Sequence, residues 1–287
     1  MTRHILMCEP AHYRIAYEIN PWMHRSNRVV QALAARQWSR LYQSLVDLGL
    51  LVELVRQGPD VPDMTFAANA GIVRGKRFMP ANFRFPQRQP ERARFVEWFE
   101  DHGYLIEEIH EPHYWEGEGD VLAADGYVFA GFRFRTEFRA LDHLDDLLGA
   151  RSHRLELVDD RFYHLDTCFC PLGEGRALWY PPAFAEGSQG AVRKLFDDLV
   201  AVEEEDALRF ACNALPVRHC VVMNAGCLTT RMALETRGFE VVEAPMDEFI
   251  KAGGSVKCLV LTLDSFPEMP HPVTLSLALS HQGRGDR

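Results

Sequence analysis

Residues 230–244 read TRMALETRGFEVVEA, a helical pattern that ends at Gly238 and is followed at once by a Val-rich strand pattern. Glycine often ends a helix because it adopts a left-handed backbone at little cost. Residues 40–55 (RLYQSLVDLGLLVELV) and 95–109 (FVEWFEDHGYLIEEI) repeat this order of helix, glycine and strand. Single helices that alternate with short strands are typical of α/β proteins. We therefore predict an α/β fold with internal repeats.

The same alternation extends along the chain without a long polar or Gly/Ser-rich linker. We therefore expect a single domain over residues 1–265, followed by a proline-rich and then polar tail over 266–287. Hydrophobic periodicity and turn residues set the expected elements. These are a helix over 26–48 with Ser26 as N-cap, a hairpin over 121–132 with its turn at Asp125-Gly126, a helix over 190–201, a strand over 219–223, helices over 228–237 and 246–251, and strands over 239–243 and 256–263.

Composition restricts the functional classes. The 287 residues are 47% hydrophobic and carry a net charge of −10, which is typical of a globular protein and suits a small cationic substrate. Basic clusters of the kind that bind nucleic acid are absent from the sequence, and so are apolar runs long enough to span a membrane. Charge begins at Arg3, too early for the apolar core of a signal peptide. We expect a cytoplasmic protein whose partner is a small molecule rather than a nucleic acid or a membrane.

The cysteines do not form a disulfide or zinc pattern. There are seven, an odd number, and no Cys-x-x-Cys occurs. His110, His113 and Glu116 are spaced like metal ligands, but Pro112 prevents the helix that would place them on one face. The sequence also lacks a Gly-rich phosphate loop. We expect no catalytic metal and no organic cofactor.

Two stretches carry candidate catalytic groups. Gly253-Gly254 precedes Cys258 at the expected start of an apolar strand, where the flexible backbone would let a ligand approach the thiol. The alternative is a buried strand cysteine after a turn. In the second stretch, residues 162–170, a strand would place His164, Asp166 and Cys168 on one face. A structural His–Asp pair at a sheet edge is the alternative there.

Two further stretches could line a pocket. Glu116, Glu118 and Asp120 lie among glycines and could orient a histidine, although a solvated acidic loop is the usual reading of such a run. Asp63 and Asn69 flank a short expected strand and could face a cation, or they could be ordinary turn residues at its two ends.

Taken in chain order, these motifs resemble the guanidino-group-modifying, or pentein, superfamily, which includes arginine deiminase, dimethylarginine dimethylaminohydrolase, glycine amidinotransferase and arginine dihydrolase. The resemblance is strongest to the arginine dihydrolase domain that forms the N-terminal part of bifunctional cyanobacterial enzymes. It implies a pentein α/β-propeller of five pseudo-symmetric ββαβ-type units. The matching stretches are Ile19-Asn-Pro-Trp-Met23, Pro62-Asp-Met64, Phe66-Ala-Ala-Asn-Ala-Gly71, Glu116-Gly-Glu-Gly-Asp120, residues 162–170, Tyr180-Pro-Pro-Ala-Phe184, Phe210-Ala-Cys-Asn213 and residues 249–258.

The resemblance also implies roles for individual residues. Cys258 resembles the nucleophile, His164 the general acid/base and Glu116 the carboxylate beside it. Substrate-binding roles fall on residues that would grip the guanidinium or anchor the substrate carboxylate. Asp63 and Asp166 resemble the groups that grip the guanidinium, and Arg88 and Arg135 resemble the anchors for the substrate carboxylate. Asn69 and Asn20 are further substrate-binding residues.

Asn69 separates the possible activities. Deiminases and dimethylaminohydrolases carry an acid at this position, whereas the dihydrolase pattern has Asn here and an Asn that matches Asn20. We therefore expect a hydrolase of linear amidines that converts L-arginine to ornithine, carbon dioxide and ammonia. The alternatives are a citrulline-forming deiminase or dimethylaminohydrolase, an amidinotransferase, and a non-catalytic arginine binder. Assembly into a homo-oligomer is also possible.

Overall fold

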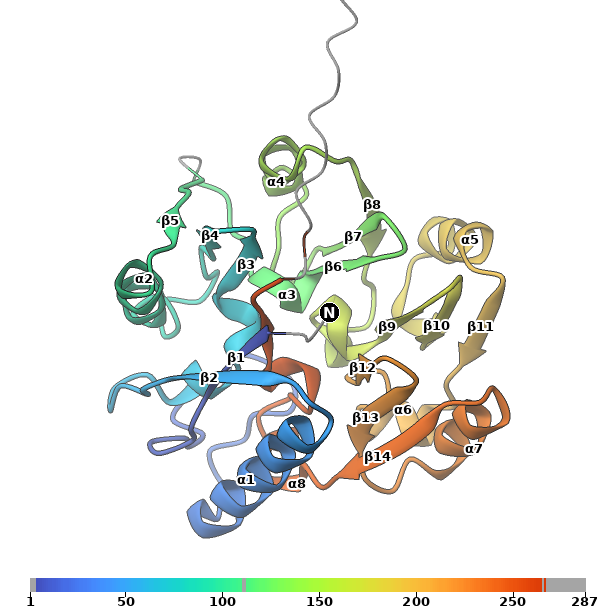
Figure 1. Cartoon of the computed structure of the whole chain (residues 1–287), viewed down its shortest axis with the longest axis horizontal. Coiled ribbons are helices and arrows are strands. Elements are labelled where there is room, and N and C mark those ends of the chain that lie inside the picture. The colour runs from blue at the N-terminus through green and yellow to red at the C-terminus, as the bar shows by residue number, and fades with distance from the viewer. Residues whose placement is uncertain (1–3, 110–111, 265, 267–287) are drawn as a thin grey trace, which may run out of the picture.

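The computed structural model describes residues 4–109, 112–264 and 266. It contains five three-stranded sheets arranged around a central axis, with the larger helices on the outer rim (Figure 1). In each sheet the middle strand pairs antiparallel with one neighbour and parallel with the other. The helix of each unit connects the two parallel strands. The expected five units of ββαβ type are thus confirmed.

Four units are continuous in sequence. In chain order, their strands and connecting helices are β3 (Gly71–Arg74), β4 (Arg77–Pro80), α2 (Glu91–Asp101) and β5 (Leu105–Ile106); β6 (Val121–Ala124), β7 (Tyr127–Phe132), α4 (Ala140–Leu148) and β8 (Ser152–Glu156); β9 (Phe169–Gly173), β10 (Arg176–Trp179), α5 (Glu186–Leu195) and β11 (Asp198–Ala201); and β12 (Leu215–Val217), β13 (Cys220–Asn224), α7 (Leu228–Thr236) and β14 (Glu240–Ala244).

The fifth unit joins the two ends of the described chain. Strand β15 (Leu261–Thr262) pairs antiparallel with β1 (His4–Cys8), which pairs parallel with β2 (Leu51–Val55) across α1 (Gln31–Asp47). Short helices α3 (Gly117–Asp120), α6 (Glu204–Leu208) and α8 (Asp247–Ile250) lie between units. The predicted tail over 266–287 lies outside the described residues apart from Phe266.

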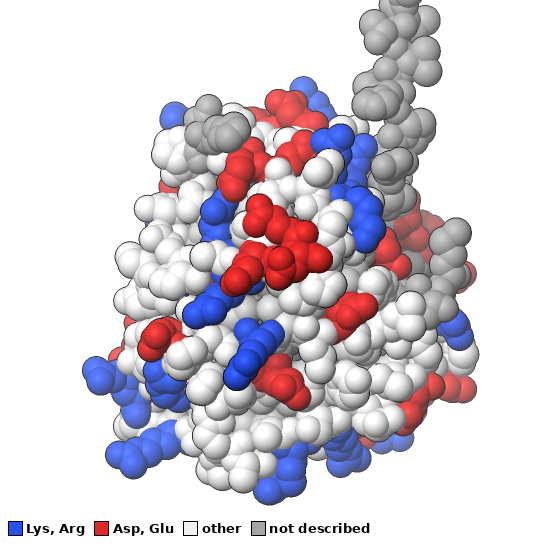
Figure 2. Space-filling view, turned by 60° about the vertical axis from the view of Figure 1, so that its left-hand side comes forward, with Lys and Arg blue, Asp and Glu red and all other residues white. Residues whose placement is uncertain are grey.

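Burial of one face holds each helix on its unit. Helix α1 buries Ala34, Trp38, Leu41 and Leu45, which recur at helical spacing, in a core that also contains Phe249. No helix among the described residues is long and apolar enough to cross a membrane. The face of the molecule shown in Figure 2 carries a central group of acidic side chains with lysines and arginines around it.

Several expected boundaries were wrong. Helix α1 begins at Gln31 rather than near Ser26, because the N-cap residue Val30 donates its backbone N–H to the distant Glu248 carboxylate (2.8 Å). The helix expected over 190–201 ends at Leu195, and its last residues form β11, because they pair with β10. The strand expected over 256–263 is a 3-10 turn followed by the two residues of β15.

Candidate active site

The candidate site is built from one recurring position in the fold. A turn or short helix precedes the first strand of each unit, and the side chains it carries meet near the axis of the five units. The residues at this position are Asn69 before β3, Glu118 before β6, Asp166 before β9, Asn213 before β12 and Cys258 before β15, each two or three residues ahead of the strand. Pseudo-symmetry therefore brings together residues that are far apart in the sequence.

Cys258 lies on the 3-10 turn Lys257–Leu259, and its side chain is buried. Asn213 holds this turn in place. Its Oδ1 accepts hydrogen bonds from the backbone N–H groups of Ser255 and Cys258, both at 3.1 Å. Its Nδ2 lies 3.1 Å from the Cys258 sulfur. Gly254 allows the turn to pass the Phe66 ring, since a Cβ at this position would lie 2.5 Å from a ring carbon.

The Cys258 thiol also donates to Oδ2 of Asp166 at 3.3 Å. Burial, followed by the nearby Asp166 carboxyl, raises the pKa of the thiol well above its ordinary value. Burial likewise raises the pKa of Asp166 to about 7, against the opposing charge of Lys257. Burial and the Asp166 contact both favour the protonated thiol over the thiolate.

His164 is paired with Glu116 inside the protein. Its Nε2 lies 2.8 Å from Oε2 of Glu116, and both side chains are almost fully buried. A carboxylate at this distance requires a proton on Nε2, which leaves Nδ1 for proton exchange. Burial alone would raise the pKa of Glu116, but the Arg135 guanidinium at 2.9 Å, together with His164, holds that pKa well below its ordinary value. Glu116 is thus an anion that orients the imidazole.

Arg88 positions Asn69. The Arg88 guanidinium forms a two-pronged ion pair with the buried Glu91, with both distances 2.8 Å, and its Nη1 donates to Oδ1 of Asn69 at 2.8 Å. These bonds fix the orientation of the amide, because only its oxygen can accept from Arg88. Gly119 is required beside it, since a Cβ there would lie 2.3 Å from Nδ2 of Asn69.

A narrow cavity lies among these groups. Burial raises the pKa of Asp63 in its wall, although the Arg88 charge opposes the shift. Within the part of the chain that the structure describes, Oδ1 of Asp63, Nδ2 of Asn69 and Oδ1 of Asp166 are buried without a hydrogen-bond partner. Such atoms are costly unless a ligand satisfies them. The cavity is lined by Ile19, Asn20, Met23, Asp63, Phe66, Asn69, Arg88, Arg135, Tyr163, Ala252, Gly254 and Cys258.

All the predicted site residues thus belong to one network. Those that do not line the cavity are bonded to one that does: Glu116 to Arg135, His164 to Glu116, and Asp166 to Cys258. Asn20 is held at the cavity wall by its hydrogen bond to the Ala252 carbonyl (3.0 Å).

One local expectation was wrong. Residues 162–168 are not a strand, because 3-10 turns occupy Asp160–Phe162 and Leu165–Thr167 and β9 begins only at Phe169. Side-chain alternation along a strand therefore does not explain why His164 and Asp166 are neighbours. The solvated loop that was the alternative for the acidic run does not form, since Glu116, Glu118 and Asp120 are all buried and bonded to partners elsewhere in the chain.

Comparison with known proteins identifies the family. The family model described as N,N dimethylarginine dimethylhydrolase, eukaryotic, matches residues 15–264. The N(G),N(G)-dimethylarginine dimethylaminohydrolase of Mycobacterium tuberculosis is 37% identical over 262 residues, which cover 91% of this chain and 86% of that protein. The chain belongs to the dimethylarginine dimethylaminohydrolase family.

Within this family the chain also resembles arginine dihydrolases. It is 41% identical over 265 residues to the bifunctional arginine dihydrolase/ornithine cyclodeaminase ArgZ of Synechocystis, but this match spans 90% of the chain and only 37% of the length of ArgZ. A crystal structure of the N-terminal domain of ArgZ, a cysteine-to-serine mutant bound to substrate, matches with a TM-score of 0.89 and 39% identity, covering 93% of this chain and all of that domain. A dimethylarginine dimethylaminohydrolase from Pseudomonas aeruginosa shares the fold at 20% identity (TM-score 0.79).

The pentein fold of the dimethylarginine dimethylaminohydrolase family explains one residue that the motifs did not assign. Asn213 falls within the matching stretch Phe210–Asn213, yet nothing in its local sequence marks it as a neighbour of Cys258. Its position before the first strand of its unit, equivalent to that of Asn69 and Asp166, is the signal that could have found it.

Proposed function

We propose that this protein is an arginine dihydrolase, a cysteine-dependent hydrolase that converts L-arginine and two water molecules to ornithine, carbon dioxide and two molecules of ammonia. The observation that supports this best is Asn69. Its amide nitrogen is buried and unpartnered within the described part of the chain, and the residue lines the same cavity as Cys258 and Asp63. An amide donor beside a carboxylate acceptor suits a group that is first a guanidinium and later a neutral urea.

Substrate binding would activate Cys258 by favouring ionisation of its thiol. The guanidinium cation can satisfy the unpaired carboxylate oxygens of Asp63 and Asp166. A cation beside Cys258 favours the thiolate by Coulomb attraction, and the Asn213 amide donates to the resulting anion at no cost of reorganisation. The thiol proton passes to Nδ1 of His164, which thereby becomes the acid for the next step, so the nucleophile forms only when its target is in place.

The proposed covalent steps use this thiolate together with His164. Sγ of Cys258 attacks the guanidinium carbon, and the bond from that carbon to a terminal nitrogen breaks as His164 supplies the proton that makes ammonia. Water, deprotonated by His164, attacks the amidino carbon and releases the thiolate with a ureido product. Glu116 stabilises the imidazolium in both half-reactions.

A second round of hydrolysis distinguishes an enzyme that forms ornithine from one that stops at citrulline. Renewed attack of Cys258 on the ureido carbon releases the second ammonia, and hydrolysis of the remaining thioester-like carbon gives carbon dioxide and ornithine. Nδ2 of Asn69 can donate to the ureido oxygen and keep this intermediate bound, whereas a carboxylate at position 69 would repel it. A variant of the ArgZ N-terminal domain has been solved covalently bound to a reaction intermediate, which supports a covalent mechanism for this chain as well.

The second candidate is a dimethylarginine dimethylaminohydrolase that releases citrulline and dimethylamine, which the family model and the mycobacterial relative favour. Deiminase and amidinotransferase activities would use the same thiol and histidine with a different product or acceptor. A non-catalytic binder would have no use for the buried contacts that Cys258 makes with both Asn213 and Asp166.

Product analysis tests the proposal. The purified protein is incubated separately with L-arginine, L-citrulline and N,N-dimethylarginine, with EDTA present, and the amino acids and ammonia are quantified; Cys258→Ser is the control. We expect ornithine with twice its molar amount of ammonia from L-arginine, and no turnover by Cys258→Ser. Citrulline as the sole end product, or turnover only of dimethylarginine, would contradict the proposal. The cytoplasmic location and the self-association of the chain remain predictions. Light scattering, which measures the mass of the particle in solution, tests the self-association.

A further inference from the structure

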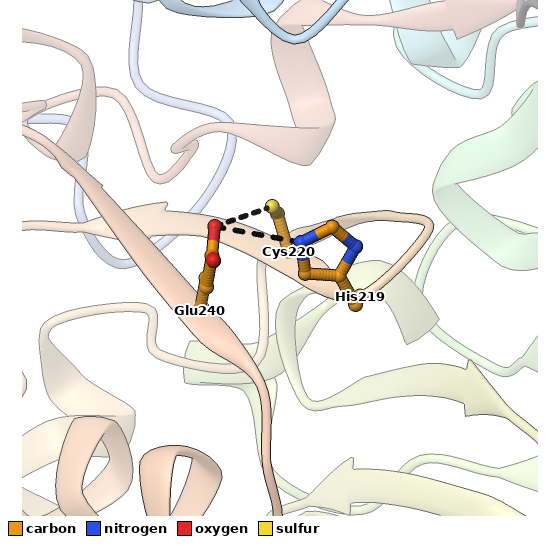
Figure 3. Close-up of side chains that lie close together, drawn as sticks. All are labelled: His219, Cys220 and Glu240. Carbon is orange, nitrogen blue, oxygen red and sulfur yellow. Dashed lines mark hydrogen bonds and ion pairs between the residues drawn. The ribbon is translucent and has the colours of Figure 1, made fainter.

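A second cluster of reactive side chains lies outside the cavity, on the unit formed by β12, β13 and β14. His219 lies in the turn between β12 and β13, Cys220 begins β13, and Glu240 begins β14 (Figure 3). Oε2 of Glu240 lies 3.4 Å from Sγ of Cys220 and 3.5 Å from Nε2 of His219. The three ligand atoms all lie within 4.8 Å of one another. None of these residues lines the cavity that contains Cys258.

The backbone holds the cluster in place. Cys220 and Glu240 are direct partners in the parallel register of β13 and β14. The N–H of Glu240 donates to the carbonyl of His219 at 3.0 Å, and Arg218 adopts a left-handed conformation (φ 56°) in the turn that precedes them. Cys220 is buried, while the side chains of His219 and Glu240 are 65% and 72% exposed. Two of the three ligand groups therefore lie at the surface, beside the buried sulfur.

We propose that His219, Cys220 and Glu240 form a binding site for one Zn²⁺ or a similar borderline-soft divalent ion, with water as the fourth ligand. Zinc bond lengths of about 2.3 Å to sulfur and about 2.0–2.2 Å to nitrogen and oxygen place tetrahedral ligand atoms roughly 3.4–3.5 Å apart. Two of the three separations already have this value, so a rotation of the exposed His219 side chain completes the set. A thiolate and an imidazole among the ligands select against Ca²⁺ and Mg²⁺.

Charge also balances at this site. In the metal-free protein the Cys220 thiol hydrogen-bonds to Oε2 of Glu240. Metal binding would replace this proton, which leaves to solvent, and the thiolate and carboxylate would neutralise the divalent charge. Because the ion joins β14 to the turn before β13 in the folded state only, it would stabilise this unit. The role is structural and independent of the proposed reaction.

Cobalt titration of the untagged Cys258→Ser protein tests the site. Removing Cys258 excludes metal binding by the thiol of the cavity, and Co²⁺ bound to a thiolate has a charge-transfer absorption that Co²⁺ bound to carboxylates lacks. We expect this band to saturate at one Co²⁺ per chain and to disappear when Zn²⁺ is added. A matching rise in the melting temperature with Zn²⁺ is the second readout.

Variants assign the ligands. Adding Cys220→Ser should abolish the band and the thermal shift, and His219→Ala or Glu240→Gln should weaken Co²⁺ binding by at least the roughly tenfold that even an outer-shell change costs. His24→Ala, at another exposed histidine, is the matched control and should change nothing. A band that survives Cys220→Ser, no band at all, or equal affinities in the His219→Ala, Glu240→Gln and His24→Ala proteins would overturn the proposal. The two surface variants keep it testable if Cys220→Ser does not fold.

Discussion

The side-chain amide of Asn213 holds both the sulfur of Cys258 and the turn that carries it. Nδ2 lies 3.1 Å from Sγ, and Oδ1 accepts from the N–H groups of Ser255 and Cys258. A single residue from the unit of β12–β14 thereby positions a residue that precedes β15. It also supplies a hydrogen-bond donor where the thiolate charge would develop.

Asn213→Ala should make Cys258 harder to ionise. Hydrogen bonds to charged groups contribute about 1.5–3 kcal/mol, so losing one should slow modification of the thiol about tenfold or more near neutral pH and move its pH dependence upward. The measurement is the rate of inactivation by a haloacetamidine as a function of pH. Asn224→Ala is the matched control, because Asn224 is equally buried but bonds to Arg209 and Met246. Identical pH profiles for wild type and Asn213→Ala would contradict the assignment.

Asn69→Asp should shift the products from ornithine towards citrulline. The new carboxylate can still accept from Arg88, so the fold should persist, but it loses the donor that would hold the ureido oxygen. Quantifying both amino acids over a time course with L-arginine measures the ratio. If the ratio does not change, Asn69 is not the cause of the second hydrolysis, although the dihydrolase activity itself would stand.

Glu116→Gln should lower catalytic activity, whereas Glu118→Gln should lower the stability of the fold. Glu116 orients His164, so Glu116→Gln should lower kcat by about 10²-fold, and His164→Ala by more. Glu118 accepts from Lys257 at 2.9 Å in a buried pair, and breaking such a pair costs about 3–5 kcal/mol. Glu118→Gln should therefore appear mainly in urea unfolding. A silent Glu116→Gln beside an inactive, stable Glu118→Gln would show that the other glutamate serves the histidine.

Asp166→Asn should remove a pH dependence of stability. Between the ordinary aspartate pKa of 3.8 and the folded value of about 7, the folded protein keeps a proton at Asp166 that the unfolded chain has lost. The free energy of unfolding of the wild type therefore falls as pH rises through this window. The variant has no such titration, so its stability should fall less over the same range, as measured by urea unfolding. The exposed Asp60→Asn serves as control and should follow the wild type; parallel curves for Asp166→Asn and wild type would refute the prediction.

Local sequence was sufficient for much of the architecture. Gly49, Gly103 and Gly238 end helices where predicted and adopt positive φ, and Asp125-Gly126 forms the predicted hairpin turn. Strand and helix patterns of this kind depend on neighbours a few residues away, so they can be read along the chain. The motifs also selected residues that the structure brings into one network, although their catalytic roles stay predictions.

The elements that local sequence patterns predicted wrongly depend on contacts with residues far away in the sequence. The start of α1 depends on Glu248, and β11 exists because it pairs with β10. The turn at Cys258 replaces the expected strand because Asn213 binds its backbone. Propensity over a few residues is weak enough for such contacts to override it.

The sequence by itself determined which side chains are available for chemistry: one thiol after a Gly-Gly pair, a histidine followed two residues later by an aspartate, and an asparagine six residues after Asp63. The tertiary structure alone decided that they meet, because the five units place equivalent turns at a common axis. It also decided their electrostatics, since burial raises the pKa of Cys258 and Asp166 while Arg135 keeps Glu116 charged. Burial and through-space charge are properties of the packed chain, and no stretch of sequence contains them.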